Sequence, residues 1–272
     1  MSFASVSFLL FFLVVLLLLL LVQRVLPFAE IKRRIICQGI LLIASYVFYG
    51  WWNMRLCLLL MGITWISFFT AVKKDEKHLR QSRISLLIGV GTPLAVLGIF
   101  KYYDFFVTSF CDVFHLTPGV LNLILPVGIS FYTFQALSYT IDVYTGKIEK
   151  EKSFLQFALY LSFFPQLVAG PIVKASEFLP QLKENRKVTL AGLESGIQIF
   201  VFGMFKKVVL ADNISVFVDE VYRSPQIFGS GTVALAVAAY AIQIYMDFSG
   251  YSDMAIGCAK CMGYELPVNF NL

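Results

Sequence analysis

The sequence predicts an all-α fold, a polytopic membrane protein with seven to nine membrane-embedded segments and broken helices in its second half. The first reason is composition: 58% of the 272 residues are hydrophobic and 14% are charged, whereas soluble domains carry about 25% charged residues. The second is a series of apolar runs near the length of about 20 residues that a helix needs to cross a bilayer. The third is the lack of the alternation over about ten residues that is typical of membrane β-barrels.

Each apolar run defines one or more of the expected segments. Residues 3–22 carry no charge and are followed by no cleavage site, so they are expected to be a retained span rather than a signal peptide. Pro and Gly interrupt later runs, and helices are expected to break there. Because the chain shows no repeat and no linker, residues 1–272 are expected to form a single membrane domain. The further runs cover residues 35–54, 56–72, 84–100, 113–141, 153–173, 188–205 and 224–246.

Loop charges predict the orientation of the chain. Basic residues are concentrated in the loops 23–34 and 73–83, and the turn between them carries only Arg55. Because cytoplasmic loops are enriched in Lys and Arg, both loops are expected in the cytoplasm and the amino terminus outside. The formal net charge of +5 is modest, without the basic stripe of a nucleic-acid surface. Membrane lipid, and no nucleic acid, is the expected partner.

Neither the cysteines nor the histidines predict a metal centre or a bound cofactor. Cys258 and Cys261 form a C-x-x-C pattern, but no second pair completes a zinc site, so both are expected to be small residues in helix packing. His78 lies in the charged loop, and His115 lies in a connection expected outside the membrane. The residues alone therefore assign no acid–base or nucleophile pair.

The densest polar cluster within apolar surroundings lies between residues 243 and 257. On a helix, Gln243, Asp247 and Tyr251 would stack at four-residue spacing, and so would Ser249 and Asp253. A carboxylate at membrane depth costs roughly 2.5–3.5 kcal/mol, so it usually faces a polar cavity or partner. Two interpretations stay open: these residues line a pocket or a polar relay, or one of the aspartates caps a helix end at the interface.

A second cluster predicts a broken helix. Pro165 and Gln166 are followed by Gly170 and Pro171, and two prolines this close interrupt a span and free its carbonyl groups. Such breaks often lie at binding sites in membrane proteins. The alternative is a plain helix end followed by a loop.

A third candidate is the lysine pair Lys206 and Lys207, which ends an apolar run. Two ammonium groups there could bind the phosphate of an anionic donor or of lipid headgroups. The alternative is that both side chains simply extend to the membrane interface.

Around these clusters the sequence resembles the membrane-bound O-acyltransferase (MBOAT) family, and within it the bacterial branch that serves alginate O-acetylation. Four blocks in the family order carry the resemblance, and the chain then ends in LPVNFNL. The blocks are LPVGISFYTFQALSYTIDVYTG (125–146), FPQLVAGPIVKASEFLPQL (164–182), FGMFKKVVLADNI (202–214) and YAIQIYMDFSGYSDMAIG (240–257).

The resemblance implies a membrane O-acyltransferase of the bacterial cytoplasmic membrane with an MBOAT-like helical bundle. It would transfer acetyl from a thioester donor, acetyl-CoA or an acyl carrier protein, to an exported polysaccharide such as alginate. Partner proteins of polysaccharide O-acetylation would work with it outside the cytoplasm. Because the family histidine that acts as base is expected beyond Leu272, the resemblance also implies an amino-terminal fragment that is inactive alone.

Two other functions remain open. A transporter or channel would equally need intramembrane carboxylates and broken helices, although many transporters show related halves that this sequence lacks. A non-enzymatic scaffold that docks a partner acyltransferase would need no catalytic histidine.

Overall fold

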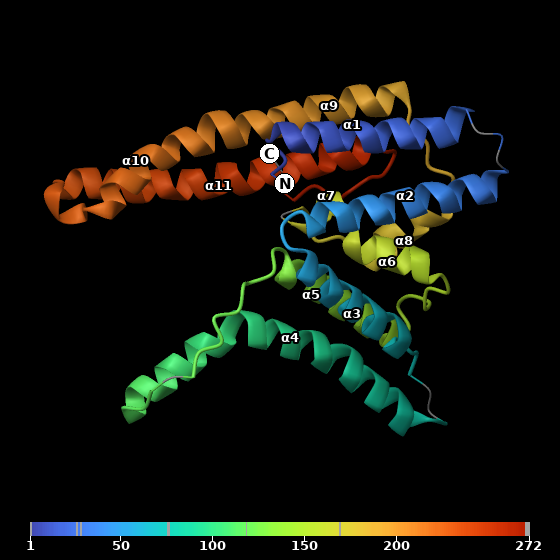
Figure 1. Cartoon of the computed structure of the whole chain (residues 1–272), viewed down its shortest axis with the longest axis horizontal. Helices are drawn as coiled ribbons and strands as arrows, with labels where there is room; N and C mark the ends of the chain where they lie inside the picture. The colour runs from blue at the N-terminus through green and yellow to red at the C-terminus, as the bar shows by residue number, and fades with distance from the viewer. Residues whose placement is uncertain are drawn as a thin grey trace. The chain divides into compact units, whose positions relative to one another are not determined.

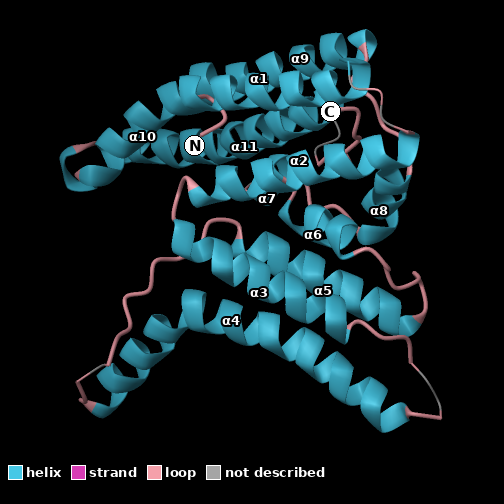
Figure 2. Cartoon of the chain, turned by 45° about the vertical axis from the view of Figure 1, so that its right-hand side comes forward, coloured by secondary structure: helices cyan, strands magenta, loops and turns pink. Residues whose placement is uncertain are grey.

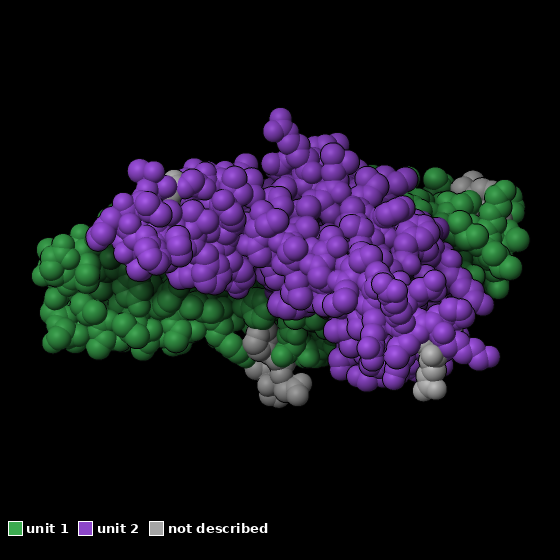
Figure 3. Space-filling model, turned by 90° about the horizontal axis from the view of Figure 1, so that it is seen from below, with its two compact units in different colours: residues 1–40, 169–172, 184–272 green, residues 41–168, 173–183 purple. Residues whose placement is uncertain are grey.

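The computed structural model describes residues 2–25, 27, 29–74, 77–117, 119–168 and 170–269, and these form helices without any strand (Figures 1 and 2). Residues 75 and 76 of the basic loop, Ala169 of the second block and residues 270–272 of the last motif lie outside the described residues. The chain divides into two compact units, shown in Figure 3. The single membrane domain expected from the sequence stays a prediction.

Unit 1 consists of residues 1–40, 169–172 and 184–272. Its centre is a pair of long helices that lie side by side (Figure 1). One continuous helix, made of α9, the π-helical η2 and α10, packs along α11. The elements of unit 1 are α1 (Val6–Leu20), η1 (Leu21–Val25), the start of α2 (Glu30–Gly50), α9 (Leu190–Met204), η2 (Phe205–Ala211), α10 (Asp212–Arg223), η3 (Pro225–Ile227) and α11 (Ser230–Cys261).

Glycine contacts show how closely α9 approaches α11. A Cβ atom on Gly196 would lie 2.7 Å from the carbonyl oxygen of Gly257, and one on Gly203 would lie 2.6 Å from that of Gly250. The pairing runs in opposite directions along the two helices, so they are antiparallel. Small residues let helix backbones approach in this way and increase van der Waals contact where lipid gives no hydrophobic driving force.

Unit 2 consists of residues 41–168 and 173–183. Aromatic side chains fill its core: the rings of Tyr139 and Phe157 lie 4.5 Å apart, and those of Phe163 and Phe178 lie 5.0 Å apart. The Tyr160 hydroxyl donates to the Val173 carbonyl at 3.1 Å. The elements of unit 2 are the end of α2, α3 (Met54–Thr70), α4 (Leu79–Phe114), α5 (Ile129–Thr145), α6 (Phe154–Ser162), α7 (Phe164–Leu167) and α8 (Ala175–Lys183).

The helix α4 is bent in Figure 1, and Pro93 lies inside it. A proline removes one helical hydrogen bond and its ring crowds the carbonyl four residues earlier, here that of Gly89. At Gly89 the helix approaches its neighbours, because a Cβ there would lie 2.9 Å from Thr140 Cγ2 and even closer to Thr70 Oγ1. The contact of α4 with α3 and α5 is therefore possible only because Gly89 has no side chain.

The number of membrane spans differs from the prediction. Among the described residues, three helical stretches are long and apolar enough to cross a membrane: Val6–Arg24, Leu79–Phe114 and Ser230–Cys261. The expected count of seven to nine is not confirmed, because prolines and polar ends divide several apolar runs into helices shorter than a span. Met54–Thr70, for instance, is apolar but shorter. The helical fold class itself is confirmed.

Candidate functional site

The candidate site lies within unit 1, where a π-helical turn faces α11. Residues Phe205–Ala211 adopt π-helical geometry between α9 and α10. Such turns are rare in proteins, and many of those known lie at functional sites. The turn carries Lys206 and Lys207, and both side chains point towards α11 rather than into a loop. The lysine pair found in the sequence therefore lies inside one long helix, not at its end.

Lys206 binds three groups at once. Its ammonium group donates to Asp253 Oδ2 at 2.7 Å and to Ser249 Oγ at 2.9 Å, and it lies 4.7 Å from the centre of the Phe202 ring. The Lys206 side chain is only 9% exposed and that of Asp253 20%. A buried ion pair is stable only when its geometry is good and further hydrogen bonds satisfy both charges, and Ser249 supplies one of these.

Lys207 binds carboxylates of its own helix and of α11. Its ammonium lies 2.8 Å from Asp212 Oδ1 and 2.6 Å from Asp247 Oδ1, and 5.8 Å from the centre of the Tyr251 ring. Both aspartates are half exposed, so this group is more open to its surroundings than the Lys206 group.

The two lysines lie on either side of Gly250. A Cβ atom at Gly250 would lie 3.0 Å from the Lys207 backbone nitrogen and 2.7 Å from the Gly203 carbonyl oxygen. The missing side chain lets the π-helical turn rest on the α11 backbone, and the lysines then reach acidic residues before and after Gly250. We call Lys206, Lys207, Asp212, Asp247, Ser249 and Asp253 the charged cluster.

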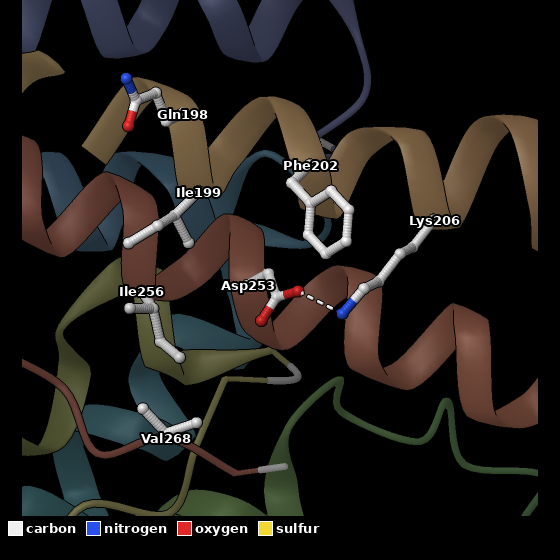
Figure 4. A pocket seen from close by; sticks show the side chains of 7 residues that line it. All are labelled: Gln198, Ile199, Phe202, Lys206, Asp253, Ile256 and Val268. Carbon is white, nitrogen blue, oxygen red and sulfur yellow. Dashed lines mark hydrogen bonds and ion pairs between the residues drawn. The ribbon is translucent and has the colours of Figure 1, made fainter. Parts of the chain in front are cut away.

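A pocket of about 390 Å³ opens beside the Lys206–Asp253 pair. Figure 4 shows Asp253 with one oxygen directed at Lys206 and the other directed away from it. The second oxygen can accept a hydrogen bond from a hydroxyl group placed in the pocket. Apart from the ion pair the walls are mostly apolar, and the pocket is lined by Gln198, Ile199, Phe202, Lys206, Asp253, Ile256 and Val268.

The remaining residues of the predicted polar cluster have separate surroundings. The Tyr251 hydroxyl lies 3.2 Å from Ser2 Oγ, and its ring lies 5.8 Å from the ring of Phe3. Gln243 lies one turn before Asp247, and its amide oxygen is buried without a hydrogen-bond partner among the described residues. Asp247 and Asp253 both lie well inside α11, so the alternative that either caps a helix end is wrong.

Around the two prolines the structure has short helices followed by an irregular stretch. Helix α6 ends at Ser162, and the short α7 contains Pro165 and Gln166, both buried. The Gln166 amide nitrogen donates to the Tyr160 carbonyl, one of the groups that the break leaves without a helical partner. Gly170 and Pro171 follow in a buried irregular stretch. Their role at a functional site stays a prediction.

A substitution at Gly128 tests how much the packing against α7 contributes to stability. Its φ is +74°, and a Cβ there would overlap the Leu167 carbonyl oxygen of α7. Gly128→Ala is expected to lower the free energy of unfolding by about 2–3 kcal/mol, since it adds backbone strain to a steric clash. Thermal unfolding in detergent measures the effect. Gly119→Ala, where a Cβ meets nothing within 4 Å, is the control and should leave the melting temperature nearly unchanged.

The cysteines have the packing role expected of them. Cys258 and Cys261 are buried and unbridged, and Cys261 Sγ lies 2.5 Å from where a Cβ of Gly196 would be. No group of three metal-ligating side chains occurs within the described part of the chain. His78 and His115 flank the two ends of α4, in unit 2. The histidine expected beyond Leu272 stays a prediction.

Sequence reasoning missed the glycine pairs and most of the pocket wall. The glycines carried a signal, because Gly196 and Gly203 are seven residues apart, and so are Gly250 and Gly257. Seven residues make about two helical turns, so each pair lies on one face. The wall residues Gln198, Ile199 and Phe202 had no such signal, since they belong to an ordinary apolar run.

The family model and the similar proteins found by comparison point to the same family. Residues 146–272 match the family model described as MBOAT, membrane-bound O-acyltransferase family. The chain is 39% identical over 239 residues to the "Probable alginate O-acetylase" of Pseudomonas putida, a match that covers 85% of this chain and 48% of that protein. It is 36% identical over 258 residues to the peptidoglycan O-acetyltransferase of Helicobacter pylori, covering 85% and 49%.

A more distant match is 27% identical over 159 residues to the teichoic acid D-alanyltransferase of Streptococcus thermophilus, covering 56% of this chain and 38% of that protein. The chain spans about half the length of the curated relatives it matches. The names of these relatives all describe transfer of an acetyl or D-alanyl group to a polymer, namely alginate, peptidoglycan or teichoic acid.

Proposed function

We propose that this chain, which belongs to the membrane-bound O-acyltransferase family, works in O-acyl transfer to a polymer outside the cytoplasm. Acetyl transfer to an exported polysaccharide such as alginate is the form that its similarity to alginate O-acetylases and a peptidoglycan O-acetyltransferase supports. One structural observation carries the proposal: the Lys206–Asp253 ion pair borders a pocket whose other walls are mostly apolar.

The physical argument begins with the cost of these charges. Ionisable groups inside a membrane segment are expensive and usually face a cavity, a partner or a substrate path. Asp253 has a partner in Lys206, and it also borders the pocket. A hydroxyl group attacks an acyl carbonyl when a base takes its proton, and a positioned hydrogen-bond acceptor orients the hydroxyl for that attack. Asp253 can provide this orientation with the oxygen that does not face Lys206.

The other predicted residues have supporting roles in this proposal. Asp247, Tyr251 and Gln243 would border the acceptor path on α11, and Ser249 would hold the Lys206 ammonium. The phosphate role of Lys206 and Lys207 stays a prediction. The charged cluster contains three carboxylates against two ammonium groups, so an anion would meet an excess of negative charge there.

The cellular setting is proposed on the same basis. The protein would lie in the bacterial cytoplasmic membrane with its amino terminus outside, because the basic residues of 23–34 gather at the end of the first candidate span. Seven to nine segments would be embedded in the membrane, three of them as full-length spans. An acyl thioester such as acetyl-CoA or an acylated carrier protein would be the donor, and polysaccharide O-acetylation proteins would be the partners.

Asp253→Asn tests the proposed function. The amide keeps the size of the side chain but loses the charge-assisted hydrogen bonds, which contribute about 1.5–3 kcal/mol each. Acetyl transfer is therefore expected to fall roughly 10- to 100-fold. The measurement is the acetyl content of the exported polymer in cells that depend on this protein, at matched protein levels.

The matched control is Asp219→Asn, the same change at an exposed position on α10. Normal acetylation with Asp253→Asn would contradict the proposal. If the protein instead exchanged a solute across the membrane of proteoliposomes without acyl transfer, the transporter function would be favoured.

A further inference from the structure

A second pocket, of about 380 Å³, lies within unit 1 away from the charged cluster. It is formed where the start of α9 meets the end of α11, and a Cβ on Gly192 would lie 3.2 Å from the Lys260 carbonyl oxygen. Both helix ends lie at the same end of unit 1 as the end of α1 (Figure 1). The pocket is lined by Asn185, Arg186, Lys187, Thr189, Gly192, Lys260, Gly263, Tyr264 and Glu265.

The charge of this pocket is opposite to that of the cluster described above. Arg186, Lys187 and Lys260 are cationic, and Glu265 is the carboxylate among the lining residues. Arg186 Nε lies 2.9 Å from an oxygen of Glu184, which is not one of the lining residues. Burial raises the pKa of the Tyr264 phenol, so Tyr264 stays neutral and does not repel an anion.

Uncharged donors add to the positive charge. Thr189 caps α9 by accepting from the Gly192 backbone nitrogen at 3.1 Å, and the other N–H groups of a first helical turn have no partner inside the helix. The Asn185 amide nitrogen is buried and has no hydrogen-bond partner within the described residues. A buried donor without a partner costs about 1–3 kcal/mol, so an acceptor atom in the pocket would be stabilising.

The loops that shape the pocket make one close backbone contact and one hydrogen bond to a side chain. Gly263 has φ +86°, and a Cβ there would lie 2.6 Å from the Lys187 carbonyl oxygen. The Val188 backbone nitrogen donates to Gln23 Oε1 at 2.9 Å, at the end of the first candidate span. The pocket therefore lies near the end of the first candidate span, and the positive charge of residues 23–34 assigns that end to the cytoplasm.

We propose that this basic pocket binds a phosphate group of the acyl donor. The proposal rests on the function proposed above, because it takes the donor to be a thioester that arrives from the cytoplasm. Both donors considered, acetyl-CoA and an acylated carrier protein, carry phosphate on the pantetheine arm that ends in the thiol. Lys187, Lys260 and Arg186 supply the charge, and the start of α9 supplies the backbone donors that phosphate groups often bind.

Coenzyme A binding to the chain in phosphatidylcholine nanodiscs tests the proposal. The variant is Lys187→Gln with Lys260→Gln, and binding is expected to weaken roughly 30-fold or more, since each lost charge-assisted contact contributes about tenfold. The control makes the same change at two exposed lysines in unit 2, Lys152→Gln with Lys174→Gln. It is expected to leave affinity unchanged. If the pocket recognises the phosphate that both donors carry, phosphopantetheine is expected to compete with coenzyme A for binding.

The outcomes separate the possible sources of phosphate. Equal affinity in the two double variants, or a wild-type chain that binds no coenzyme A, would overturn the proposal. If only phosphatidylglycerol nanodiscs show a difference between the variants, the pocket is a lipid headgroup site and the donor assignment is wrong. If the lysine variants weaken coenzyme A binding while Asp253→Asn leaves acetylation of the exported polymer normal, the phosphate site is retained and the proposed acyl transfer at Asp253 is rejected.

Discussion

Lys206→Met is expected to lower the free energy of unfolding by about 3–5 kcal/mol, because it leaves the Asp253 carboxylate buried without a charge partner. The methionine fills the same space, so the loss reports the missing ammonium rather than a cavity. Lys206 also holds Ser249 and faces the Phe202 ring, and these contacts are lost with it. Unfolding in a denaturing detergent titration measures the change.

Two further variants identify the cause. Lys206→Arg keeps the charge and is expected to restore part of the lost stability. The double variant Lys206→Met with Asp253→Asn removes both charges and should be clearly more stable than Lys206→Met alone, since replacement of a buried pair by neutral groups is often nearly neutral. A Lys206→Met protein as stable as the wild type would show that water or another hydrogen-bond donor satisfies Asp253 instead.

The second large effect is expected at the closest approach of the two long helices. Gly257→Val would place side-chain atoms against the Gly196 carbonyl oxygen and the Phe200 backbone nitrogen, which lie 2.6 Å and 2.7 Å from the position of a Cβ. Backbone cannot move aside as a side chain can, so α9 and α11 must separate. We expect a loss of about 3 kcal/mol or more and a melting temperature lower by roughly 6–10 °C.

The matched control for this prediction is Gly231→Val on the same helix, where a Cβ meets nothing within 4 Å. Its effect should stay within about 1 kcal/mol, since valine and glycine differ by less than that in helix propensity. Gly257→Ala should lie between the two, because it adds the Cβ without the branches. An equal melting temperature for both valine variants would mean that the α9–α11 contact contributes little to stability.

Some of the site could be read from spacing along one helix. Gln243, Asp247 and Tyr251 were predicted to stack on a helix, and they lie within α11. Four-residue spacing is a local property, so no tertiary information was needed. The partner of each carboxylate was not local: Asp253 and Lys206 are 47 residues apart. Nothing in the sequence distinguished that pairing from a phosphate contact, because both use the same lysine charge.

The count of spans shows the same limit. Hydropathy detects a run of apolar residues, and it located each of the three long apolar helices. It does not detect whether a helix continues through a polar stretch. Helix α11 extends beyond the apolar run 224–246 and includes the polar cluster, because Lys206 neutralises Asp253 and Lys207 neutralises Asp247 from the neighbouring helix.

By itself, the sequence determined that the protein is helical and suited to a membrane, since these properties follow from composition and from periodicity within single segments. It also determined the family, because four ordered blocks are enough for that. The tertiary structure alone decided which charges meet, where the two pockets lie and why four glycines are needed. Those features depend on distances between segments far apart in the chain, and a pattern along one segment contains no information about such distances.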